Sequence, residues 1–455
     1  MLELPFWLTL LYWSLVPSTQ TLLLEIGSVP INSKDIILVV VSCLYLLLAT
    51  INNPKKDFAS RPRNWHCYLP IVTFILLIYA AFTMLFYAEV LPQGIGDIHP
   101  MEDRLALAMR FTLIFTASSC FLGYIIIAKK TPEAVHSFLW RLTVCLAGIG
   151  ILYCAVTFLG VNLGDVRSDI VSAQDVHGIL RVVGPLFGAA NGFFILVPAL
   201  AFSVQEFFRD RTQRLFKLSI IFSLMLTIIG LGSRAALVIL GLFFIFLSFS
   251  MKNKKQSIAT IMLLIIVILA VGGLVFNQTN TERLNSFEDS GRSDTHLISF
   301  KIIAHRDLEF NIVGSGYGSY WSWYLTNNEM NLNTDMSMAS TRFGKMLYHP
   351  HSVFLLLIVE LGIFGLLYFV YLWIILGRLL INRSKSAAFP IFYCGVFASG
   401  FSMFFNFFIF KSQPINTIWW IYLFGALSLR YSKFSGKLQF NTQQQQDELS
   451  KLPEK

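Results

Sequence analysis

Two arginines stand close to long apolar stretches, where a charged side chain is costly. Arg234 lies in Leu-Gly-Ser-Arg-Ala-Ala, a tight turn between two such stretches, and Arg181 shortly precedes another. An arginine at the end of an apolar helix often serves only to place its charged group in water. For either arginine considered alone, this explanation has about the same weight as a functional role. A guanidinium fork, however, matches phosphate oxygens in pairs. We therefore predict that Arg234 binds a phosphate group, with Arg181 as a weaker candidate.

His351 is the candidate for proton transfer. It occurs in His-Pro-His-Ser, directly before an apolar stretch that contains Gly362 and Gly365. A histidine at such a boundary is more often an interfacial polar residue than a catalyst, yet imidazole is the side chain best suited to accept a proton near neutral pH. The two glycines would let a neighbouring helix approach closely, and simple packing is the alternative explanation for them.

Metal-binding patterns are absent from the sequence. No apolar stretch carries H-x-x-x-H, no cysteine accompanies a histidine at ligand spacing, and no D-x-D pair occurs. Carboxylate pairs and His or Cys clusters are what divalent cations require. We expect neither a metal nor another cofactor. Three further histidines in the polar segments are predicted to be surface residues: His177, His296 and His305.

Composition indicates the surroundings in which these residues act. Of 455 residues 55% are hydrophobic and only 13% are charged, and the mean hydropathy is +0.63. Too few polar side chains remain to cover a soluble protein of this size. We predict an all-α polytopic membrane protein, because about 12 stretches approach the roughly 20 apolar residues that a transmembrane helix needs. They are 6–24, 35–51, 67–91, 105–128, 142–161, 187–207, 216–232, 235–251, 256–275, 351–377, 388–409 and 413–429.

The basic residues distinguish the two sides of the membrane. The net charge of +9 comes mainly from alternate connections, whereas the other connections hold few basic residues. By the positive-inside rule the basic connections and both termini face the cytoplasm, so the charge does not indicate nucleic-acid binding. The predicted organisation is a first group of transmembrane helices in 1–275, a large outer loop in 276–350, a last group in 351–431, and a disordered cytoplasmic tail in 432–455.

The large outer loop carries two recognisable features. Residues 294–305 have apolar side chains at helical spacing, which predicts a short amphipathic helix. Gly-Ser-Gly-Tyr-Gly at 314–318 predicts a flexible turn. Because a long loop without structure of its own is unusual unless it has a function, we expect the chemistry on the outer side.

These residues together resemble a known family. His351-Ser352, nine residues, Gly362, two residues and Gly365 fit the signature H-[NSQ]-x9-G-x-x-G of the O-antigen ligase and polymerase superfamily, which transfers lipid-linked glycans in the bacterial envelope. Other family landmarks follow in order over about 175–375: Arg181 with Gly184, the Gly232-Ser233-Arg234 turn, Arg292 before the amphipathic helix, and the glycine run at 314–318.

The resemblance implies a mechanism and a location. The donor would be a glycan on undecaprenyl pyrophosphate, the acceptor a glycan or the lipid A core, and the active site would lie on the periplasmic side of the inner membrane. Arg234 and Arg292 would bind the pyrophosphate, with Arg181 as a third cation, and His351 would be the general base. Transfer would be metal-independent and would invert the anomeric carbon. His349, two residues before the signature histidine, is a second candidate base.

Three functions stay open on the sequence alone. A lipid A core acceptor would make the protein a ligase, and a second lipid-linked repeat would make it a polymerase. A lipid-linked glycan flippase or transporter is the alternative from another class. Transporters show internal repeats and charges at mid-membrane depth, whereas the ionic residues here cluster at the predicted outer face. Ligase is therefore predicted slightly ahead of polymerase, and transport is third.

Overall fold

The computed structural model describes most of the apolar segments. The described residues are 3–16, 22–26, 29–51, 68–87, 100–128, 130–159, 182, 184–187, 192–250, 254–275, 296–297, 299–300, 303–304, 306–314, 316–317, 339–341, 344–346, 352–381, 389–405 and 413–431. The predicted tail at 432–455 lies outside them, and so do Arg181, Arg292, His349 and His351.

Within these residues the protein is predominantly helical, as predicted. The helices are α1 (Leu4–Leu15), α2 (Ser33–Ile51), α3 (Leu69–Tyr87), α4 (Pro100–Ala128), α5 (Pro132–Phe158), α6 (Phe193–Arg209), α7 (Arg214–Gly230), α8 (Arg234–Ser250), α9 (Lys254–Val275), α12 (Leu308–Val313), α14 (Val353–Leu380), α15 (Pro390–Gly400), the 3-10 helix η4 (Phe401–Phe404) and α17 (Gln413–Tyr431). Two antiparallel hairpins were not expected: β1 (Leu22–Ile26) with β2 (Val29–Asn32), and β3 (Ala339–Thr341) with β4 (Gly344–Met346).

Helix α5 begins where the sequence supplies local start signals. At α5 the Thr131 side chain accepts a hydrogen bond from the Ala134 amide at 3.3 Å, Pro132 fills the first helical position, and Glu133 lies in the first turn. A capping hydroxyl, a proline that lacks an amide donor and an early carboxylate all stabilise a helix N-terminus. The boundary therefore follows from the residues themselves.

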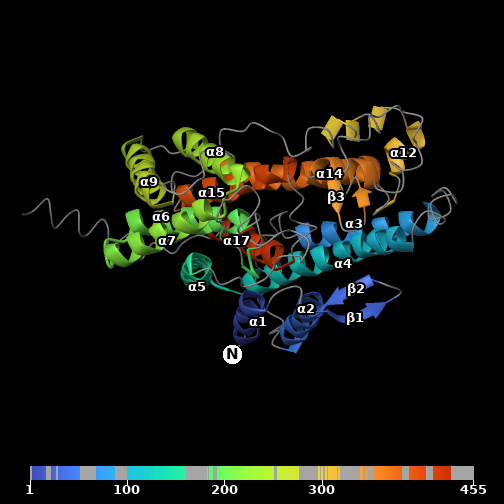
Figure 1. Cartoon of the computed structure of the whole chain (residues 1–455), viewed down its shortest axis with the longest axis horizontal. Helices are drawn as coiled ribbons and strands as arrows, with labels where there is room; N and C mark the ends of the chain where they lie inside the picture. The colour runs from blue at the N-terminus through green and yellow to red at the C-terminus, as the bar shows by residue number, and fades with distance from the viewer. Residues whose placement is uncertain are drawn as a thin grey trace, which may run out of the picture.

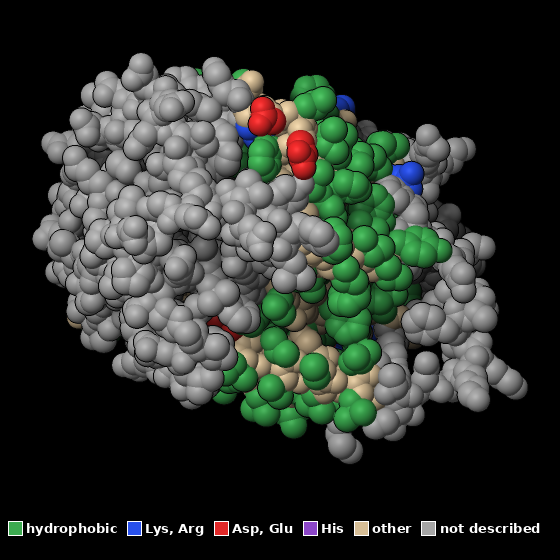
Figure 2. Space-filling view, turned by 90° about the vertical axis from the view of Figure 1, so that its right-hand side faces the viewer, with side chains coloured by type: hydrophobic (Ala, Val, Ile, Leu, Met, Phe, Trp, Pro, Cys, Tyr) green, Lys and Arg blue, Asp and Glu red, His purple; other side chains and the backbone are tan. Residues whose placement is uncertain are grey.

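The outward faces of the helices are apolar, as a bilayer requires. Along α3 the side chains of Ile71, Phe74, Ile75, Ile78 and Phe82 are each more than half exposed, at the spacing of one helical face. Figure 2 shows hydrophobic side chains over most of the described part of one face, with acidic and basic ones near its edges. Exposed apolar surface of this extent is incompatible with water. Among the described residues α5 and α14 are long and apolar enough to cross a membrane.

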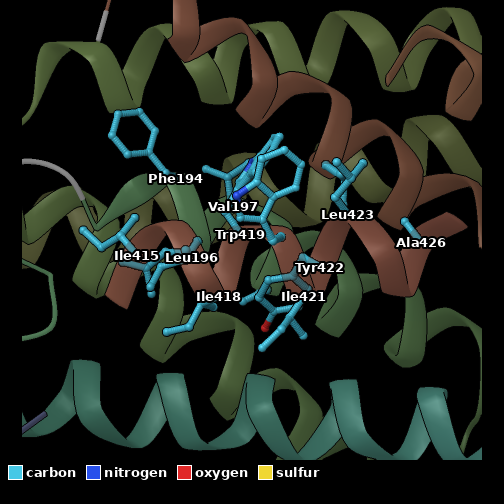
Figure 3. Close-up of a cluster of buried hydrophobic side chains, with 14 of the residues drawn as sticks. Phe194, Leu196, Val197, Ile415, Ile418, Trp419, Ile421, Tyr422, Leu423 and Ala426 are labelled. Carbon is cyan, nitrogen blue, oxygen red and sulfur yellow. The ribbon is translucent and has the colours of Figure 1, made fainter. Parts of the chain in front are cut away.

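The centre of the bundle is formed by α6, α15 and α17. Antiparallel α6 and α15 are in contact along their lengths, and α17 packs on α4 as well as on α6 (Figure 1). Trp419 of α17 lies beside Val197 of α6, whereas Tyr422 points to the other side of α17, where its hydroxyl lies 3.0 Å from the Thr143 hydroxyl of α5 (Figure 3). This dense packing provides the rigid frame on which the polar residues are held.

Three predicted stretches differ in shape from the expected straight helices. Residues 6–24 form a helix only to Leu15, and 22–26 is the strand β1. Residues 388–409 form α15 and the 3-10 helix η4, which ends at Phe404. From Val353 onward the predicted stretch 351–377 lies in α14, which bends at Gly362. Hydropathy reports the apolar environment of a segment, which a strand or a bent helix shares with a straight one.

Candidate functional site

Arg234 is the predicted site residue that the structure describes. It is the first residue of α8, it is partly exposed, and it follows a tight turn in which Gly232 has a φ of +58°. The Ser233 carbonyl accepts hydrogen bonds from the amides of Ala236 and Leu237, at 3.0 and 3.4 Å. Since the turn is held by its own backbone, the Arg234 guanidinium projects from a fixed position at the N-terminus of α8, where the helix dipole also favours an anion.

The segment that follows Arg181 is attached to the same turn. The Val182 amide donates to the Gly230 carbonyl at 2.8 Å, four residues before Arg234. A Cβ on Gly230 would lie 2.6 Å from the Val182 side chain, so glycine is needed for this approach. Two motifs about 50 residues apart in the sequence are therefore joined at one end of α7.

Buried polar groups fix the rest of this segment. The Leu186 amide donates to the Tyr153 hydroxyl at 3.2 Å. Gly184 packs against the Tyr153 ring, and a Cβ on Gly184 would lie 2.2 Å from the ring carbons Cδ2 and Cε2. Lys34, only 4% exposed, donates from Nζ to the Pro185 carbonyl at 3.2 Å. These contacts connect the segment to α5 and α2, and they were not predicted because each joins residues distant in sequence.

Ser352, the second residue of the family-like signature, has a defined structural role. It is 1% exposed, its Oγ accepts from the Leu355 amide at 3.3 Å, and it lies 3.5 Å from the Met403 carbonyl, to which it donates. The hydroxyl thus caps α14 and connects it to η4. His351 lies outside the described residues, but its chain neighbour is fixed between these two elements.

The helix α14 has two arms, 353–361 and 363–380, that meet at Gly362. Gly362 has a φ of +57° and a ψ of −139°, a conformation for which glycine is strongly preferred. The rings of Phe354 and Phe369 lie with centroids 5.1 Å apart, whereas 15 residues along a straight helix would separate them by about 22 Å. Both rings also contact Phe404 in η4. The first arm is therefore folded back toward the long arm.

The glycines of the outer segment pack tightly against this bend. Gly314 and Gly316 have φ values of +86° and +91°, and the Gly316 amide donates to the Glu360 carbonyl at 2.9 Å. A Cβ on Gly314 would lie 2.3 Å from the Glu360 carbonyl oxygen, and one on Gly362 would lie 2.5 Å from that of Ile312. The predicted flexible turn is thus, at Gly314 and Gly316, a close backbone-to-backbone contact, and Gly362 admits the C-terminal end of α12 at Ile312 together with Gly314, which follows it.

Arg306 is the residue in this region that the sequence did not single out. Its side chain, only 7% exposed, donates from Nη1 and Nη2 to the carbonyls of Val359 and Ile358, at 2.6 and 3.0 Å, and from Nε to Asn311 Oδ1 at 2.7 Å. Burial lowers the pKa of Arg306 to about 10, so the side chain stays charged at neutral pH. Arg306 is one of several basic residues in a polar segment, and nothing in its spacing marks it.

The predicted amphipathic helix at 294–305 is visible only in pieces. Residues 296–297, 299–300 and 303–304 are helical, and a separate short helix, α12, follows at Leu308–Val313. The Tyr79 hydroxyl of α3 donates to the Val313 carbonyl at 2.6 Å, which fixes the end of α12 to the bundle. The outer segment therefore rests on α3 and on the bend of α14.

Comparison with known proteins finds a similarity to one family over part of the chain. Residues 218–370 match the family model of the O-antigen ligases. Over this range the chain is similar to the O-antigen ligases. The matched range runs from α7 into the long arm of α14 and includes the Arg234 turn, Arg306, and Gly362 with Gly365. The family resemblance predicted from the motifs is confirmed, and no curated protein and no solved structure matches the chain significantly.

The matched family indicates the general chemistry of this site. Superfamily members are membrane-integral glycosyltransferases of the ligase or polymerase type, acting on lipid-linked glycans in polysaccharide biosynthesis. The site residues fit an anionic leaving group, since Arg234 lies at a helix N-terminus beside the Arg181 segment. Among the described residues no group of three or more His, Cys, Asp or Glu side chains could hold a metal ion. Metal independence stays a prediction.

Proposed function

We propose that this protein transfers a glycan from undecaprenyl pyrophosphate to an acceptor hydroxyl on the periplasmic face of the inner membrane, with the lipid A core as acceptor. One observation carries the proposal. The hydrogen bond from Val182 to Gly230 ties the residue after Arg181 to the end of α7, and Arg234 follows on the next turn. This contact supports the proposal that Arg181 and Arg234, which belong to separate family motifs, serve one region, as a doubly anionic leaving group requires.

In the proposed reaction the arginines stabilise charge and the histidine removes a proton. The acceptor oxygen attacks the anomeric carbon while the bond from that carbon to the pyrophosphate oxygen breaks, so the configuration inverts. His351 takes the acceptor proton, and the pyrophosphate leaves as an anion that needs no general acid. Arg234 and Arg292, with Arg181 as a third cation, stabilise the charge that develops on the leaving group.

The folded-back arm of α14 supports His351 as the base. Because Ser352 caps α14, is buried and donates to η4, the residue that follows His351 in the chain is held in place. A general base contributes most when it is held within hydrogen-bond reach of the acceptor proton.

Reconstitution tests the proposal directly. The purified protein in liposomes is supplied with a lipid-linked oligosaccharide and, in separate samples, with lipid A core or with further lipid-linked repeats. Release of undecaprenyl pyrophosphate with a glycosylated core supports the ligase, and release only with added repeats indicates the polymerase. A change in the sidedness of the donor without release of pyrophosphate would identify a flippase and refute the transferase.

A further inference from the structure

The bend of α14 and the outer segment form one connected structure, here called the clasp. It consists of Arg306, Asn311, Gly314, Gly316 and the bend residues 358–362. The break at Gly362 ends the first arm of α14, so carbonyls at the end of that arm lose their partners within the helix. Arg306 and Gly316 supply replacement donors to three successive carbonyls, those of Ile358, Val359 and Glu360.

The electrostatics of the clasp favour a guanidinium over other donors. The C-terminal end of a helix arm carries partial negative charge, which a cation stabilises. Arg306 presents several N–H groups from one plane and bonds two carbonyls and an amide oxygen at once, an arrangement that the single ammonium of lysine does not reproduce. Because Arg306 is nearly fully buried, its removal takes one hydrogen bond from each of the Ile358 and Val359 carbonyls, and the loss of such bonds in a buried region is costly.

The first arm of α14 connects the clasp to the residue after the candidate base. One end of the arm is bonded to Arg306 and Gly316, and the other end begins at Ser352, which is bonded to Met403. Nine helical residues between two fixed ends form a short rigid rod, and its Phe354 side chain packs against Phe369 and Phe404. Because this arm does not deform easily, we expect a displacement of the clasp to move the start of α14 as well.

We propose that Arg306 is a positioning residue: it sets the register between the outer segment and the arm that begins next to His351, and thereby holds the base relative to the lipid-linked donor. Arg306 contacts neither substrate nor base in this account and acts through the first arm of α14. The inference rests on the proposed transfer reaction, and its test includes a measurement that needs no transfer.

Hydrogen exchange and kinetics together test the proposal. In Arg306→Ala we expect faster amide exchange in peptides covering 306–317 and 353–362, with peptides of α6 unchanged as an internal reference. A displacement of about 1 Å in a reacting group costs roughly 100-fold in rate, so kcat should fall by about 100-fold while KM and the shape of the pH profile stay as in the wild type. Arg306→Lys should recover part of kcat. Arg211→Ala, an exposed arginine before α7, should change neither measurement.

A variant less disruptive than Arg306→Ala tests the clasp in case Arg306→Ala does not fold. Asn311→Ala removes the acceptor of the Arg306 Nε bond but leaves both carbonyl bonds, so it should accelerate exchange at 306–317 with a smaller loss of kcat. Unchanged exchange in both variants would refute the clasp. Faster exchange with unchanged kcat would refute the positioning role and leave the transferase standing. A wild-type protein without transfer activity would refute the proposed function, and the positioning role with it.

Discussion

Replacing Gly362 with alanine isolates the contribution of the bend in α14. A side chain at a φ of +57° and a ψ of −139° costs about 1 to 3 kcal/mol in backbone strain. The added Cβ would also lie 2.5 Å from the Ile312 carbonyl oxygen and 2.6 Å from the Gly314 amide nitrogen, whereas ordinary contacts lie between 3.4 and 4 Å. Both opposing atoms belong to backbone, so the outer segment must move by about 1 Å to admit a methyl group.

The strain alone should shift the equilibrium between the packed and the displaced outer segment by roughly 5- to 150-fold. If the segment positions the donor and the base, Gly362→Ala should lose at least tenfold in kcat while the protein still inserts and remains folded. The assay is release of undecaprenyl pyrophosphate by purified protein in liposomes, with membrane abundance measured by immunoblot and folding by thermal unfolding in detergent.

The same helix offers a matched control. Gly377 lies in the long arm of α14, and a Cβ there would meet nothing within 4 Å. Because alanine is favoured over glycine in a helix by about 0.5 to 1 kcal/mol, Gly377→Ala should leave the reaction rate unchanged and should not lower stability. Equal activity of the Gly362 and Gly377 variants would refute the reasoning, since it would mean that the bend and its contact with Gly314 are not needed for the reaction.

Three further predictions concern the arginines, metals and topology. Arg234→Lys keeps the charge but loses the planar pair of donors, so transfer should fall strongly at normal membrane abundance; near wild-type activity would make Arg234 an interfacial anchor. Transfer should survive EDTA, because in the proposed mechanism arginines rather than metal-bound carboxylates hold the pyrophosphate; loss with chelator and rescue by magnesium or manganese would contradict this. A reporter active only in the periplasm should be active when fused at Asn328 and inactive at Lys254; the reverse result would refute the predicted orientation.

The helical nature of the protein was predictable because it follows from local properties. The apolar runs that became α5, α7 and α9 are long, and Thr131 with Pro132 marks the start of α5. The bend in α14 was not predictable from hydropathy, since the residues around Gly362 other than Glu360 are apolar. Gly362 was noted as a packing glycine, but whether its partner is a helix or a loop depends on residues some 50 positions earlier in the chain.

In the candidate site, as in the fold, local residue patterns were predictable and contacts between residues distant in sequence were not. Arg234 was predicted from residue type and position, and its location at the start of α8 is consistent with the expected tight turn. Arg306 and Lys34 were missed as candidates because each acts on backbone carbonyls far away in sequence, and such acceptors leave no residue pattern. Sequence motifs identify the side chains that contact a substrate, whereas the groups that position those side chains are found only from the three-dimensional structure.

Single-turnover transfer by His351→Ala, compared with His349→Ala, tests the central claim most directly. A positioned general base contributes about 100- to 10,000-fold, so His351→Ala should transfer no detectable glycan while still binding the donor, and His349→Ala should lose much less. Wild-type activity should decrease as the pH falls through the range near 6.5 where imidazole becomes protonated, because only the neutral ring accepts a proton. Loss confined to His349→Ala would assign the base two residues earlier, and activity in both variants would contradict histidine catalysis.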